Sequence, residues 1–108
     1  MAKLINIGKI LVGFNQKPML DTSGGYITIK DILLQYAGNH TSQDGRKRIA
    51  TRLFGEKLFK ADRNNELELS DAEFKLLELM LQKPAHPDII LTQIDEMMDE
   101  VKDVKKDK

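Results

Sequence analysis

The sequence uses the same helix-start pattern twice, and this pattern fixes where two helices begin. Residues 28–31 (Thr-Ile-Lys-Asp) and 70–73 (Ser-Asp-Ala-Glu) each place a hydroxyl and a carboxylate three positions apart, which is a capping box. A hydrophobic staple flanks each box, Ile27 with Ile32 in the first case and Leu69 with Phe74 in the second. A chain built around such starts is expected to be mainly helical.

Four helices follow from these starts and from the spacing of apolar residues. The first is predicted over about 29–37, ending at Gly38, and the third extends from its capping box to near Lys83. The second, over roughly 43–60, contains Gly55 at a cost of about 1 kcal/mol relative to Ala. A fourth begins at Pro87 and continues at helical spacing through Ile90, Ile94, Met97 and Val101. The second helix carries two adjacent apolar rows, Ile49 with Leu53, and Ala50 with Phe54 and Leu58.

The segments outside these helices favour a small β element. Residues 1–27 are predicted to be extended, because the apolar residues from 4 to 14 are β-branched and interrupted by glycines. A turn at 15–18 makes a hairpin of this segment, and 67–69 alternates like a very short strand. The expected fold is mainly α (α+β), with a small N-terminal β-hairpin packed on a compact bundle of about four helices. One globular domain is expected over 1–101, followed by a frayed charged tail at 102–108.

Composition excludes several classes of protein. Lys and Arg total 17, and so do Asp and Glu, so no global charge favours nucleic acid or membranes. The chain has no Cys, which excludes disulfides, thiolate nucleophiles and Cys-based metal sites. No apolar run approaches the length of a membrane span, and the N-terminus lacks the apolar core of a signal peptide. We therefore expect a soluble cytoplasmic protein.

No group of residues in the sequence identifies a reaction or a metal site. Residues 62–73 match the carboxylate spacing of a calcium-binding EF-hand loop, but Leu67 stands where that loop needs Gly to turn. The alternative interpretation, a turn followed by a helix cap, explains the same residues. His40 and His86 lie in loop-like stretches without a partner at metal-ligand spacing, and we expect both to be exposed. The sequence predicts no enzyme activity, no cofactor and no metal.

Charge is strongly segregated along the chain. Residues 46–63 hold seven basic residues against two acidic ones, whereas 64–100 hold ten acidic residues against two basic ones. The basic helix is a candidate surface for charge contacts, with Arg46, Arg48 and Arg52 as its leading residues. Three interpretations stay open: contact with phosphates of a nucleic acid, ion pairs within the molecule, and head-to-tail self-association.

The fourth helix has more apolar positions than one packed face needs. Methionine adapts well to contact surfaces, so Ile90, Ile94, Met97 and Met98 are candidate contacts with a partner chain or a second copy. The alternative is that a small domain wraps this helix on two sides.

The pattern resembles a family of small bacteriophage-encoded accessory proteins. The similarity covers most of residues 4–98 and lies in the turn at 13–18, the Thr-capped helix at 26–34, a second helix ending at 60–62, the segment 66–77 and a proline-started last helix. The cluster Arg46-Lys47-Arg48 and the Lys-rich tail depart from the family pattern. The resemblance implies a phage accessory protein in the infected host cell and supplies no catalytic residues.

These observations predict a non-enzymatic phage accessory protein that binds a protein partner. The partner would be a host or defence factor that it inhibits, or a virion component that it helps to assemble. The alternative is a small DNA- or RNA-binding regulator that uses the basic helix 46–63. A homo-oligomer stays open, and no membrane contact is expected.

Overall fold

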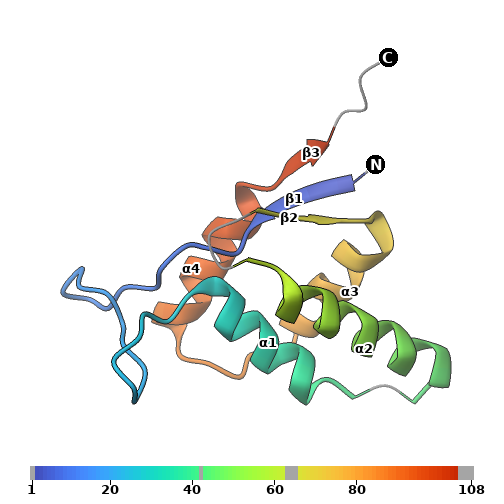
Figure 1. The fold of residues 1–108 in the computed structure, drawn as a ribbon, viewed down its shortest axis with the longest axis horizontal. Coiled ribbons are helices and arrows are strands. Elements are labelled where there is room, and N and C mark those ends of the chain that lie inside the picture. The colour runs from blue at the N-terminus through green and yellow to red at the C-terminus, as the bar shows by residue number, and fades with distance from the viewer. Residues whose placement is uncertain (1, 42, 63–65, 105–108) are drawn as a thin grey trace.

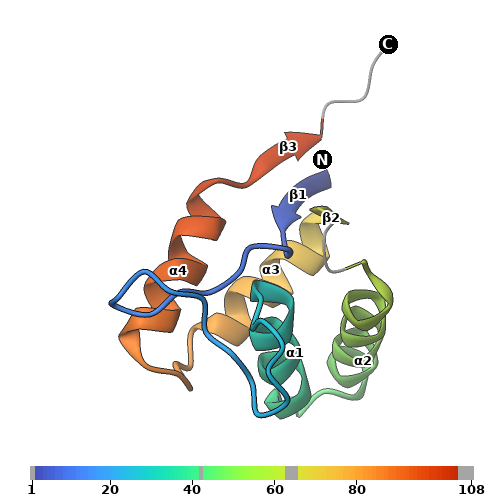
Figure 2. The same cartoon turned by 60° about the vertical axis from the view of Figure 1, so that its left-hand side comes forward.

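The computed structural model describes residues 2–41, 43–62 and 66–104 and shows a mainly helical chain with a small sheet (Figure 1). The order of elements is β1 (Ala2–Asn6), α1 (Ile29–Asn39), α2 (Gly45–Lys60), β2 (Glu66–Leu69), α3 (Asp71–Leu81), α4 (Asp88–Asp99) and β3 (Lys102–Val104). The predicted fold class is confirmed. Helices α1 and α2 lie together, with α4 on the opposite side of the molecule from α2 (Figures 1 and 2).

The sheet joins segments from both ends and the middle of the chain. Its three strands are antiparallel in the order β2-β1-β3, with Ile5 opposite Leu67 and Lys3 opposite Leu69. Leu67 and Leu69 point into the core while Glu66 and Glu68 are exposed, which is the predicted alternation of a half-buried strand.

The tail prediction is wrong for residues 102–104. Local sequence favoured fraying there, but backbone pairing with β1 holds these residues as β3, with Lys102 opposite Leu4. The free edge of β1 supplies hydrogen-bond partners that the tail lacks on its own. Residues 105–108 of the predicted tail lie outside the described residues.

The predicted N-terminal hairpin is present, and residues 26–28 pair with both of its arms. Val12 pairs with Pro18 across the turn, in which Gln16 has a φ of 64°. The backbone N–H of Leu11 donates to Ile27, that of Ile27 donates to Met19, and that of Met19 donates to Leu11. These three hydrogen bonds, of 2.9, 3.0 and 2.8 Å, link the three backbone segments to one another, and the side chain of Leu11 is fully buried.

Both capping boxes form as predicted. The Asp31 carboxylate accepts hydrogen bonds from the backbone N–H and the hydroxyl of Thr28, at 2.9 and 3.1 Å. At α3 the Ser70 hydroxyl accepts from the Glu73 N–H at 3.2 Å, and the Glu73 carboxylate accepts from the Ser70 N–H at 2.9 Å. Helix α1 continues through Gly38 to Asn39, and α4 begins one residue later than predicted, with Pro87 as its N-cap.

The core lies between the sheet and the four described helices. A buried amide fixes α4 against the N-terminal segment: Gln93 accepts from the Val12 N–H at 2.9 Å and donates to the Val12 and Ile89 carbonyls at 2.8 and 2.6 Å. Gln93 is only 6% exposed. The largest fully buried side chains are Ile5, Ile7, Leu11, Ile29, Leu33, Phe54, Leu58, Leu69, Leu77, Ile94 and Met97.

Candidate functional site

Helix α2 buries one side and exposes large apolar residues on the other. Phe54 and Leu58 are in the core, whereas Ile49, Leu53 and Phe59 are 62%, 60% and 71% exposed. Of the two rows seen in the sequence, only the row ending in Phe54 and Leu58 packs against the domain. The row formed by Ile49 and Leu53 faces solvent, because it lies on the side of α2 that is turned away from the rest of the molecule (Figure 2).

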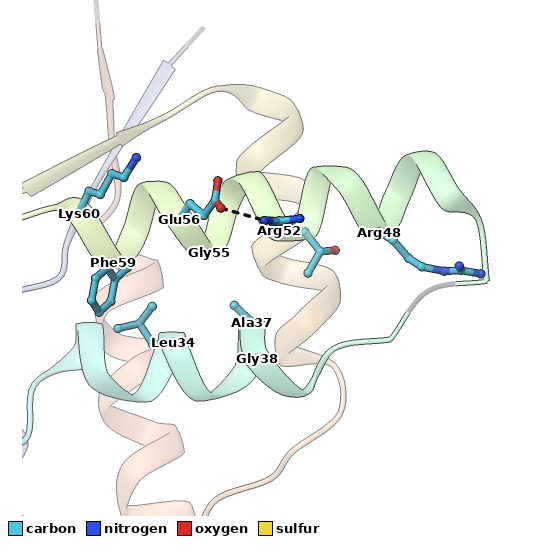
Figure 3. A pocket seen from close by; sticks show the side chains of 10 residues that line it. Leu34, Ala37, Gly38, Arg48, Arg52, Gly55, Glu56, Phe59 and Lys60 are labelled. Carbon is cyan, nitrogen blue, oxygen red and sulfur yellow. Dashed lines mark hydrogen bonds and ion pairs between the residues drawn. The ribbon is translucent and has the colours of Figure 1, made fainter.

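The exposed side of α2 consists of two parallel stripes. One stripe, at positions 46, 49 and 53, forms an outer ridge with Arg46 beside Ile49 and Leu53. The other stripe, at positions 48, 52, 55 and 59, faces α1 across a groove of about 670 Å³ (Figure 3). We call this cavity the α1–α2 groove; it is lined by Leu34, Ala37, Gly38, Arg48, Thr51, Arg52, Gly55, Glu56, Phe59 and Lys60.

The floor of the α1–α2 groove is apolar. Leu34 rises from α1 toward Phe59 of α2, and Ala37 rises toward Gly55, as Figure 3 shows. The helices approach each other at Gly55, where a Cβ atom would lie 3.7 Å from the Cβ of Ala37, an ordinary contact that does not require glycine. At Gly38 the space around the missing side chain is open, with nothing within 4 Å. The open space in the groove therefore lies at Gly38.

A buried lysine holds the Phe59 end of the groove in place. The Lys30 ammonium donates to the carbonyl of Phe59 at 2.9 Å and to that of Ala61, and it lies 5.9 Å from the centre of the Phe59 ring. These carbonyls are at the C-terminus of α2, where helix geometry leaves backbone acceptors unpaired and the macrodipole favours a cation. No local pattern in the sequence indicates this role, because Lys30 is 29 and 31 residues from its partners.

Three basic residues line the groove. Arg52 makes an exposed ion pair with Glu56 at 3.4 Å, one helical turn along α2. The Arg48 guanidinium donates to the Gln43 carbonyl at 3.0 Å and extends past the start of α2. Lys60 also lines the groove, but its ammonium points away from α1 (Figure 3). Two of the predicted charge contacts, Arg48 and Arg52, thus lie on the groove, while Arg46 lies on the outer ridge.

On its other flank α2 is tied to α3 by an ion pair. Lys57 donates to the Glu73 carboxylate at 2.9 Å, above a smaller hollow of about 290 Å³. Burial raises the pKa of Glu73, but hydrogen bonds from Ser70 and Lys57 outweigh it, so the pKa is lowered overall. The segment 66–73 is therefore a strand leading into a capped helix, with the Glu73 carboxylate engaged by protein donors.

The predicted contacts on α4 belong mostly to the core. Ile94 and Met97 are 1% and 2% exposed, so the prediction that they contact a partner is wrong for the folded chain. Ile90 and Met98 are partly buried and pack against the same core. The N-terminal segment covers this helix through the hydrogen bonds between Gln93 and Val12, and β1 contacts it as well.

His86 is not the exposed loop residue that the sequence predicted. Its Nε2 atom lies 2.8 Å from the Gln35 side-chain oxygen, and its ring is 5.1 Å from that of Tyr36. The Tyr36 hydroxyl accepts from the Ala85 N–H at 3.0 Å, so this group fixes the loop before α4 onto α1. His86 thus has a structural role here.

Among residues 2–41, 43–62 and 66–104, no three His, Cys, Asp or Glu side chains are grouped closely enough to hold a metal ion. Over the same part of the chain, no helix has the length and apolar character required to cross a bilayer.

Comparison with known proteins gave no match. No protein-family model, no curated protein and no solved structure is significantly similar to this chain.

Proposed function

We propose that this protein is a non-enzymatic phage accessory protein that binds a protein partner through the exposed side of α2. The observation that carries the proposal is the exposure of Ile49, Leu53 and Phe59 on a single 16-residue helix. Ile49 and Leu53 are neighbours one helical turn apart, and exposed apolar patches on a small domain mark interaction sites more often than isolated apolar residues do.

The residue types on α2 suit a protein interface. Arginine and aromatic residues are enriched in such interfaces, and this helix offers Arg46, Arg48 and Arg52 beside Phe59. Burying one exposed side chain of the size of Leu or Phe contributes about 1.5–3 kcal/mol. Two or three such anchors with complementary charge around them are enough for specific binding.

An accessory protein that blocks or positions another protein needs a surface of complementary shape, a few apolar anchor residues and complementary charge. We propose on this basis that the partner is a host or defence factor that the protein inhibits, or a virion component that it helps to assemble. The resemblance to phage-encoded accessory proteins supports this choice and the cytoplasm of the infected cell as its location. Because Ile94 and Met97 of α4 are buried, we propose apolar contacts on α2 in their place.

Affinity capture with matched variants tests the proposal. The double variant Ile49→Ser/Leu53→Ser removes the outer ridge, and Leu20→Ser serves as control because Leu20 is 57% exposed on the N-terminal segment. We expect the wild type and the control to retain the same partner from cells in which the gene is naturally expressed. The double variant should lose that partner while its circular dichroism spectrum stays unchanged. Equal retention by all three proteins would refute the proposal.

Nucleic-acid binding is the second candidate function. It is favoured by the basic residues of α2, since Arg46, Lys47, Arg48 and Arg52 are exposed within two turns. Filter binding of duplex DNA and of RNA across a salt series tests it, because phosphate contacts weaken steeply as salt rises. A steep salt dependence that Arg46→Glu and Arg48→Glu abolish would support this function. Absence of binding at low salt would refute it.

A further inference from the structure

We infer that the exposed side of α2 also binds the acidic side of α4 from a second copy of the chain, so that copies associate head to tail. This inference goes beyond the proposed function, because it gives the same helix a second occupant, the protein itself. It is carried by the opposite charges of the two helices and by their positions on opposite sides of the molecule (Figures 1 and 2).

Helix α4 exposes an acidic stripe. Four exposed residues follow one another at spacings of four, three and four and so lie on one side of the helix: Asp88, Thr92, Asp95 and Asp99. Glu96 is exposed beside them. Within the described residues, no ion pair engages any of these four carboxylates. The folded chain therefore does not neutralise the negative charge of the stripe.

The stability of α4 does not account for this charge. Glu96 and Asp99 lie in the last turn of the helix, which contains no basic residue. Negative charge is unfavourable there, because the helix macrodipole places partial negative charge at the C-terminus. Carboxylates that weaken their own helix are understandable if they contact a cation of another molecule.

The exposed side of α2 combines the opposite charge with two apolar anchors. Arg46 lies on the outer ridge beside Ile49 and Leu53, and Lys60 follows Leu53 by seven positions on the same side. The Lys60 ammonium points away from α1, as Figure 3 shows. Over the described part of the chain, neither of these two cations is in an ion pair, whereas Glu56, the only acidic residue of the helix, is already paired within it.

The two charged surfaces have similar lengths. Arg46 and Lys60 are about 21 Å apart along α2, and Asp88 and Asp99 are about 17 Å apart along α4, since an α-helix rises about 1.5 Å per residue. When the helices are antiparallel, Arg46 meets the Asp99 end of the stripe and Lys60 meets the Asp88 end. The long basic side chains bridge the remaining difference in length.

The antiparallel arrangement also gives the apolar anchors a place to pack. Ile49 and Leu53 are 62% and 60% exposed and lie between the two cations of α2. On α4, Leu91 and Met98 are seven positions apart, so they flank the acidic stripe on one side, and both are partly exposed. The contact therefore joins apolar groups as well as charges.

Other pairings of two copies are disfavoured by charge. Two α2 helices face to face would place six basic residues against six, and two α4 stripes would place carboxylates against carboxylates. Because α2 and α4 lie on opposite sides of the molecule, one pair of copies makes this contact only once, so the interface is heterologous and association extends copy by copy. The chain has 17 basic and 17 acidic residues, so such a row of copies stays balanced in charge.

Analytical ultracentrifugation of the whole, nuclease-treated protein tests the inference. A contact between two helices is small for a protein interface, so we expect association in the range of about 10 μM to 1 mM. The average mass should rise beyond that of a dimer as the concentration increases at about 50 mM salt. The association constant should fall by about threefold or more at about 500 mM salt, because salt screens exposed charges.

Two double variants each remove one side of the contact. Ile49→Ser/Leu53→Ser removes the anchors of α2, and Asp95→Lys/Asp99→Lys reverses the charge of the α4 stripe at exposed positions. We expect each variant alone to stay monomeric. A mixture of the two should form a dimer and nothing larger, because one intact α2 and one intact α4 remain between them. The matched control Glu68→Lys/Glu78→Lys makes the same change in net charge at exposed positions of β2 and α3 and should associate within about twofold of the wild type.

Several outcomes would overturn the inference: a wild type that stays monomeric up to about 1 mM, association by either double variant alone, or a mixture that does not dimerise. So would association that is lost on nuclease treatment, since a nucleic acid would then bridge the copies. The proposed function is tested separately, because Asp95→Lys/Asp99→Lys keeps α2 intact and should still capture the partner. A monomeric wild type with partner capture lost in Ile49→Ser/Leu53→Ser would remove this inference alone, whereas partner capture retained by that variant would remove the proposed function alone.

Discussion

Replacement of Gln93 should destabilise the whole domain, although this residue is polar and far from the exposed side of α2. The Gln93→Leu variant keeps the size of the side chain and removes its amide. Three hydrogen bonds are lost, two to Val12 and one to Ile89. The Val12 N–H and carbonyl then lose their side-chain partner in a partly buried position, where replacement by water is incomplete.

The magnitude follows from these contacts. A neutral hydrogen bond contributes a net amount of about 0.5–1.5 kcal/mol, and orphaned backbone groups add to the loss. We expect Gln93→Leu to lower the free energy of unfolding by about 2–3 kcal/mol, offset only in part by the apolar side chain. Domains of this size are stable by about 5–15 kcal/mol, so the melting temperature should fall by about 10–20 °C.

Urea unfolding followed by circular dichroism measures the loss, with Gln82→Leu as control because Gln82 is exposed at the end of α3. The control should change stability by about 0.5 kcal/mol at most. Hydrogen exchange supplies a local readout, since the Val12 amide should lose protection in Gln93→Leu. A Gln93→Leu protein with wild-type stability, or an unchanged Val12 exchange rate, would show that the amide does not hold α4 against the N-terminal segment.

Three further variants test the contacts around α2. Lys30→Met should lower the free energy of unfolding by about 1–3 kcal/mol in urea unfolding, because two carbonyls at the end of α2 lose a charged donor. Gly55→Ala should raise it by about 1 kcal/mol, since the added methyl group meets Ala37 at an ordinary 3.7 Å; a loss of stability would refute the packing described here. Glu73→Gln should cost about 1 kcal/mol at neutral pH. Folding lowers the pKa of Glu73 below its usual value of 4.5. The contribution of the Glu73 carboxylate to the free energy of unfolding is therefore complete above pH 4.5 and is lost as the pH falls through the lower pKa of the folded state. We expect the stability of Glu73→Gln to depend less steeply on pH in acid than that of the wild type.

Local patterns in the sequence predicted local structure well. The capping boxes at Thr28 and Ser70 are where they were expected, because a capping box is closed by residues three positions apart. The short strand at 67–69 followed from alternation alone. Each of these features depends on neighbours within a few residues, and a single sequence contains that information in full.

Features that depend on long-range contacts were missed. Residues 102–104 have no strand signal of their own and become β3 only because β1 offers a free edge. Gln93 and Lys30 look like ordinary surface residues of amphipathic helices until the chain brings Val12 and Phe59 to them. Both are buried because they satisfy backbone groups, and periodicity of apolar residues cannot reveal such a role.

The candidate surface was misplaced for a related reason. Apolar excess on a helix signals either a helix packed on two sides or one with a free apolar face, and the sequence does not show how many neighbours a helix has. Met97 of α4 faces the core, whereas Ile49 and Leu53 lie on the side of α2 that is turned away from the rest of the molecule (Figure 2). Arg48 and Arg52 were expected at the surface and are exposed there, because charge is expelled from the core wherever the neighbouring helices lie.

The exposed side of α2 is difficult to explain by stability alone. Serine or lysine at Ile49 and Leu53 would leave the buried row of Phe54 and Leu58 untouched and would lower the tendency to aggregate. Helix propensity does not account for the choice at position 49 either, since Ile is a weaker helix former than Lys or Ala. Retaining large apolar side chains where solvent disfavours them is understandable if another molecule covers them.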